Sequence, residues 1–173
     1  MIIRYGGEGA HDVPCGVQPV RDHTEVGMTE LQEMHGIAWV AALGQHLAAV
    51  VTPLLPGDRE LVATGSELAV MVRRDGAPLR VATSYRLPTP SARSVLDAGA
   101  VDEILRDLQD DIAVHLGCAW PTAASGTTLS AVARDADGVI EIAFEPRRGD
   151  PAEAIVLEPF VPPPPPDEAR VAG

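Results

Sequence analysis

The chain has 173 residues, of which 46% are hydrophobic, and its formal net charge is -12. A chain of this length is the size of one domain and can bury an ordinary core without disulfides or metal ions. All of its basic residues are arginines, and no basic stripe is visible. An acidic chain of this kind repels phosphate backbones, so we expect no nucleic-acid partner.

The first 28 residues predict an extended or flexible arm, because glycines and prolines interrupt them without any helical or strand period. No basic segment followed by an apolar one marks an export signal here. We therefore expect a cytoplasmic protein in which Cys15 and Cys118 are free thiols. The domain itself is expected over 29–160, followed by a proline-rich tail over 161–173 that serves either as a ligand motif or as a spacer.

The first helix is predicted over 29–52, where Thr29 begins a capping-box pattern and Pro53 ends the helix. From residue 36 to residue 57 the chain has no Asp, Glu, Lys or Arg. This length approaches a bilayer span, but Gln45 lies near its centre and no Lys or Arg flanks it closely. We favour a buried or interface-packed helix over a membrane span. Its apolar circumference predicts a covering partner, either the N-terminal arm or a second subunit.

Residues 61–87 alternate between apolar and polar around the turn "RRDGAP", which predicts a hairpin. A second hairpin is predicted over 129–144 around "RDADGV", with a last short strand over 154–160. Between the hairpins, residues 95–116 give an amphipathic helix with one apolar stripe. The stripe consists of Val101, Ile104, Leu105, Leu108, Ile112 and Leu116.

The stretch "HLGCAWPT" ends this second helix. We expect Gly117 to adopt the left-handed conformation just past the helix, which lets Trp120 fold back over the helix end. Together these patterns predict a single α+β domain of order α-β-β-α-β-β(-β). We expect an antiparallel sheet of four or five strands with the two helices packed on one face.

No nucleophile elbow or phosphate-binding loop is present, so we expect no cofactor and no catalytic residue. The only residues of metal-ligand type that gather in the sequence lie in the arm and at the end of the second helix. Neither C-x2-C nor H-E-x-x-H occurs, which makes the pattern weak evidence for zinc. These metal candidates are His11, Cys15, His23, His115 and Cys118.

The leading interpretation is a non-catalytic acidic protein-protein interaction or assembly module that is oligomeric through the helix at 29–52. The first alternative is an immunity-type or secretion-chaperone-like binder of a basic client, in which the acidic helix mimics a polyanion. The second alternative is a small enzyme or metal-binding protein that uses histidine and cysteine. The predicted interaction residues are Trp39, Asp107, Asp110, Asp111, Trp120 and Phe160.

Overall fold

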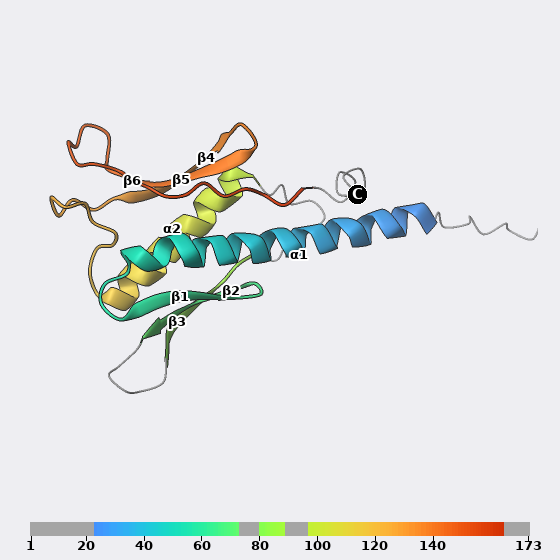
Figure 1. The fold of residues 1–173 in the computed structure, drawn as a ribbon, viewed down its shortest axis with the longest axis horizontal. Coiled ribbons are helices and arrows are strands. Elements are labelled where there is room, and N and C mark those ends of the chain that lie inside the picture. Colours follow the sequence, from blue (N-terminus) through green and yellow to red (C-terminus); the bar gives the residue numbers. More distant parts are fainter. Residues whose placement is uncertain (1–22, 73–79, 89–96, 165–173) are drawn as a thin grey trace, which may run out of the picture.

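The computed structural model describes residues 23–72, 80–88 and 97–164 (Figure 1), with the backbone alone for 23–32 and Arg80. It confirms the α+β class but not the single sheet, because six strands form two separate three-stranded antiparallel sheets of order β1-β2-β3 and β4-β5-β6. The elements are α1 (His23–Val51), a 3-10 turn (Thr52–Leu54), β1 (Arg59–Thr64), β2 (Glu67–Val72), β3 (Arg80–Arg86), α2 (Ala98–Leu116), β4 (Ser130–Ala136), β5 (Val139–Glu145) and β6 (Ile155–Val156).

The order of elements predicted from the sequence omits one strand between the two helices. Residues 59–87 form three strands and not two, because Gly65 reverses the chain at a φ of 59° and pairs β1 with β2. Glycine takes this positive φ without steric cost, and that is what a two-residue hairpin turn needs. The turn predicted at "RDADGV" is confirmed, since Asp137 and Gly138 join β4 to β5 with φ values of 47° and 87°.

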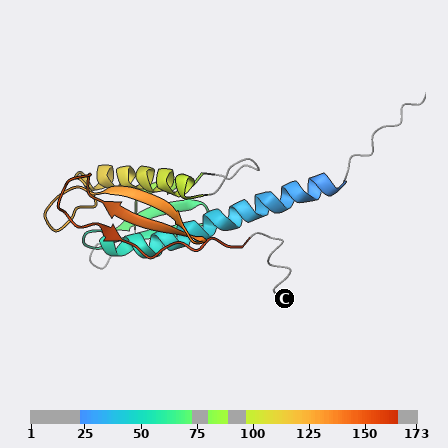
Figure 2. The ribbon, with the colours of Figure 1, turned by 90° about the horizontal axis from the view of Figure 1, so that it is seen from above.

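Helix α1 begins at His23, six residues before the predicted start at Thr29. No proline lies between the two positions, so the backbone allows the helix to extend past the capping-box pattern. The N-terminal turns of α1 project beyond the two sheets (Figure 2). The part of the predicted arm before residue 23 and the part of the predicted tail after residue 164 lie outside the described residues.

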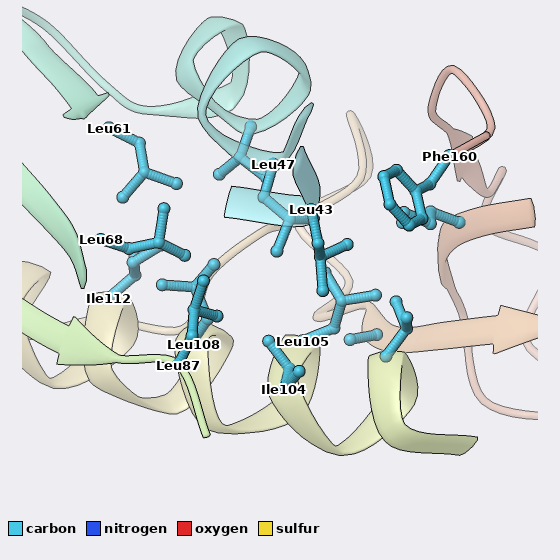
Figure 3. Close-up of a cluster of buried hydrophobic side chains, with 14 of the residues drawn as sticks. Leu43, Leu47, Leu61, Leu68, Leu87, Ile104, Leu105, Leu108, Ile112 and Phe160 are labelled. Atoms are coloured by element: carbon cyan, nitrogen blue, oxygen red, sulfur yellow. The ribbon is translucent and has the colours of Figure 1, made fainter. Parts of the chain in front are cut away.

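The two helices lie between the two sheets (Figure 1) and form one continuous core with them. In Figure 3, α1 and α2 face each other across this core, with the first sheet on one side and the second sheet on the other. The buried residues of α1 recur every three or four positions, as expected for one helix face. They are Gly36, Trp39, Val40, Leu43, Gly44, Leu47 and Val51.

Helix side chains close the open edges of β1 and β4. Thr52 accepts a hydrogen bond through Oγ1 from the Leu61 N–H at 2.9 Å, and Gln45 Nε2 donates to the Ala63 carbonyl at 3.3 Å. On the other sheet, Gln109 Oε1 accepts from the Ala131 N–H at 2.8 Å. These contacts satisfy strand groups that face away from the partner strand, and buried backbone groups need such partners.

The remaining junctions complete a ring of elements around the core. The Tyr85 hydroxyl on β3 donates to Asp107 Oδ2 on α2 at 3.3 Å. The segment after β6 runs along β5, where Ile140 and Phe160 exchange backbone hydrogen bonds. His46 Nε2 on α1 lies 2.9 Å from the Glu158 carbonyl oxygen of that segment. The helices therefore separate the two sheets. Their residues bond to the edges of β1 and β4, where a further strand would pair if the six strands formed one sheet.

Helix α2 follows the sequence prediction closely. Asp97 caps its start by accepting a hydrogen bond from the Ala100 N–H at 3.0 Å. Gly117 ends it with a φ of 67°, as predicted. Trp120 then folds back into the core with 6% exposure, and its Nε1 donates to the Leu54 carbonyl at 3.0 Å. This contact connects the end of α2 to the end of α1.

Candidate functional site

The face of α1 opposite its buried residues is partly exposed and carries no charge from Met34 onward. Met34 is 67% exposed and Ile37 is 61% exposed. A helix on the surface of an acidic protein ordinarily places charged residues on this face, so exposed large apolar residues are the informative observation. We call this set of residues the α1 stripe. It consists of Met34, Ile37, Ala38, Ala41, Gln45, Ala48, Ala49 and, in the 3-10 turn that follows, Thr52; of these, Ala41, Ala48 and Thr52 are half-buried.

The C-terminal half of the α1 stripe leads into an open groove of about 460 Å³ between α1 and β1. Glu60 is the one charged residue among those that line it. The groove includes Val62, which is 36% exposed. Its lining residues are Gln45, Ala48, Ala49, Thr52, Pro53, Glu60, Leu61, Val62 and Ala63. Bulky side chains thus stand at one end of the stripe, and a hollow with mostly uncharged walls lies at the other.

A second surface feature is the acidic face of α2. Asp107 and Asp110 are exposed and Asp111 is half-buried. Among the described residues the salt bridges are Arg106 with Asp102 and Arg134 with Glu145, so none of these three carboxylates belongs to an ion pair there. We call Glu103, Asp107, Asp110 and Asp111 the α2 acidic face.

The acidic face affects the neighbouring tyrosine. Burial is the largest cause that raises the pKa of Tyr85 from 10.0 to about 12, and the charge and hydrogen bond of Asp107 add to it. Negative charge nearby disfavours a second anion, and burial disfavours any ionised form. Tyr85 therefore stays a neutral hydrogen-bond donor to Asp107 throughout the physiological pH range.

The three aromatic residues predicted for the interaction surface lie in the core. Trp39 is 2% exposed and packs edge-to-face on Phe160, with ring centroids 5.2 Å apart. Phe160 is also 2% exposed, and Trp120 packs on Phe144 at 5.6 Å. These residues hold α1, α2 and the C-terminal segment together, whereas the predicted Asp107, Asp110 and Asp111 are at the surface.

The metal candidates do not form a cluster in the described part of the chain, where no group of three His, Cys, Asp or Glu residues is placed to hold a metal ion. Cys118 is exposed and is a free cysteine. The Nε2 atom of His115 is buried and has no hydrogen-bond partner among the described residues. His11 and Cys15 lie outside the described residues, as does the side chain of His23.

The segment Glu33–Leu54 is long and apolar enough to cross a membrane, with a mean hydropathy of 1.5, and 39% of its apolar window is buried inside the fold. Core helices of soluble proteins and signal sequences share these properties, so length and composition are weak evidence. No family model, curated protein or solved structure matches this chain.

The groove and the residues that bond to the strand edges were not predicted from the sequence. Gln109 lies beside the apolar stripe of α2, and a polar residue at that position is the signal that could have identified it. The groove has no such signal, because it depends on how α1 lies along β1. The exposed stripe was visible only as an excess of apolar residues around α1.

Proposed function

We propose that this chain is a non-catalytic protein-binding module that self-associates through the α1 stripe. The observation that supports the proposal is an exposed helix face that carries Met34 and Ile37 and has no charged residue. A contiguous apolar surface on a soluble domain is typical of a protein-protein contact. The core on the other side of α1 is already filled without Met34, Ile37 and Ala38, so these exposed residues of the stripe are not needed for the folding of one copy.

Charge favours the same surface. Each copy has a formal charge of -12, so most contacts between copies would bring like charges together. The chain between Met34 and Gly57 has no Asp, Glu, Lys or Arg. Two copies can approach each other there with the least electrostatic opposition.

The test is a comparison of molar mass by light scattering for two matched variants across a concentration series. Ile37→Glu places a charge in the stripe, and Val114→Glu places the same charge at a site on α2 that is 82% exposed. We expect dimers for the wild type and for Val114→Glu, and monomers for Ile37→Glu. Equal behaviour of the two variants, or a monomeric wild type at every concentration, would contradict the proposal. Flotation of a monomeric wild type with neutral lipid vesicles would point to a membrane in place of the second copy.

A second candidate function, binding of a basic client, is favoured by the α2 acidic face. Three exposed carboxylates on one helix face, Glu103, Asp107 and Asp110, have no ion-pair partner among the described residues. Such a surface attracts Arg-rich or Lys-rich partners and speeds their association at low salt. A direct binding experiment tests this function.

The probe is a synthetic arginine-rich peptide, with affinity measured by calorimetry at two salt concentrations. Reversing Asp107, Asp110 and Asp111 to lysine should abolish binding. Reversing three exposed acidic residues elsewhere makes the same change in net charge and should leave most of the affinity. These control positions are Asp58, Glu141 and Glu153. If both triple variants lose affinity equally, the peptide responds to net charge and the α2 acidic face is not a binding site.

A further inference from the structure

The α1 stripe has the spacing of a coiled-coil seam. Residues 34, 38, 41, 45, 48 and 52 are separated alternately by four and three positions. This alternation keeps one face of a helix against a neighbouring helix over several turns. Four of the six residues are alanine or threonine, and small residues let two helix axes approach to about 8 Å.

The two ends of this seam are complementary in shape. Met34 and Ile37 protrude at the N-terminal end, while the groove opens beside Ala48 and Thr52 at the C-terminal end. Met34 and Ala48 are 14 residues apart, which is about 21 Å along a helix. A symmetric pair has the same surface on both copies, so that residue i contacts residue j and j contacts i.

We infer that two copies pair with their α1 helices antiparallel, so that Met34 and Ile37 of each copy enter the groove of the other. This inference rests on the proposed self-association and specifies its geometry. The twofold axis passes between Ala41 and Gln45. Ile37 and Ala48 lie on the same side of the seam, so Ile37 of one copy lies opposite Ala48 of the other, at the wall of its groove. A parallel pair would instead place the protruding residues against each other and leave both grooves empty.

The contact area of this pair is small. The seam from residue 34 to residue 52 is about 28 Å long and about 10 Å wide, or about 280 Å² of helix face on each copy. Contact with the β1 wall of the groove adds to this, but a stable complex ordinarily buries about 800 Å² on each partner. We therefore expect a dimer that dissociates on dilution, not a permanent one.

Cysteine cross-linking tests the geometry in a chain with Cys15→Ser and Cys118→Ser. Ile37→Cys and Ala48→Cys are made as separate proteins, because Ile37 is exposed and a cysteine at the half-buried position 48 adds only one sulfur atom beside the groove. A disulfide needs Cα atoms within about 7 Å, whereas in the antiparallel pair like positions lie about 18 Å apart at 37 and about 15 Å apart at 48. Mixing the two proteins under mild oxidation should give the mixed disulfide and neither homodimeric one.

The outcomes separate this geometry from the underlying proposal. Homodimeric disulfides from each variant alone would show a parallel pair and overturn the inference. A dimer by light scattering without any of these cross-links would also overturn it, while self-association through another surface would remain. No dimer and no cross-link would refute both the geometry and the proposed function.

Discussion

Truncation of the half-buried side chain of Gln109 should strongly lower the free energy of unfolding. Its side chain makes three hydrogen bonds to backbone groups between Trp120 and Ala131, in the segment that follows α2 and at the start of β4. Nε2 donates to the carbonyls of Trp120 at 3.0 Å and Leu129 at 2.6 Å, and Oε1 accepts from the Ala131 N–H at 2.8 Å. The side-chain amide of Gln109 thus supplies the donor and the acceptor that the peptide group of a neighbouring strand would supply.

The expected cost of Gln109→Ala follows from these contacts. Each hydrogen bond contributes about 0.5–1.5 kcal/mol net, and a backbone group left buried without a partner costs about 1–3 kcal/mol. Water reaches part of this half-buried site, so we expect a loss of about 2–4 kcal/mol in the free energy of unfolding. For a domain of this size each kcal/mol lowers Tm by about 2–4 °C.

The assay is urea unfolding followed by circular dichroism at a protein concentration where the chain is monomeric. Gln45→Ala is the matched control, since Gln45 is exposed and makes a single bond of 3.3 Å to Ala63. That control should lose less than about 1 kcal/mol. Equal losses for the two variants would contradict this expectation, because the number and burial of the hydrogen bonds would then not determine the loss in the free energy of unfolding.

Three further predictions concern single residues. With Tyr5→Phe to remove the other tyrosine, ultraviolet titration should place the pKa of Tyr85 at about 12, and Asp107→Asn should bring it closer to 10.0. Because the pKa is raised in the folded state, its contribution to stability is present below pH 10 and is lost as the pH rises toward 12. Gly117→Ala should cost about 1–2 kcal/mol in urea unfolding, since it forces a side chain into the left-handed region; an unchanged midpoint would argue against that conformation. Trp120→Phe should cost about 1–3 kcal/mol, and a larger loss for Phe than for Ala would contradict a packing role.

Local features of the fold could be predicted from the sequence. The apolar stripe of α2 and the left-handed Gly117 follow from spacing and from the preference of glycine for that conformation, and the structure confirms both. The Asp137–Gly138 turn was predictable for the same reason, since turn residues act over a few positions. Patterns of this kind depend on neighbours in the chain and not on the tertiary arrangement.

The arrangement of the sheets could not be predicted in the same way. A hairpin pattern does not specify which strand lies next to it, so two hairpins and a last strand suggested one sheet. In the structure, Thr52 and Gln109 occupy the edges of β1 and β4 and prevent the sheets from joining there. The burial of Trp39 and Phe160 was also beyond the sequence, because their contact joins segments about 120 residues apart.

The edges of β1 and β4 bear on how copies of this chain could assemble, because helix side chains already bond to each of them. An open strand edge accepts a copy that exposes a new edge in turn, so its growth has no natural end and leads to fibrils. Two helices that meet across a twofold axis use the same surface on both copies, and the assembly stops at two. By bonding Leu61 of β1 to Thr52 and Ala131 of β4 to Gln109, the chain leaves these two edges less open to a further strand, and the proposed pairing through the α1 stripe would end at two copies.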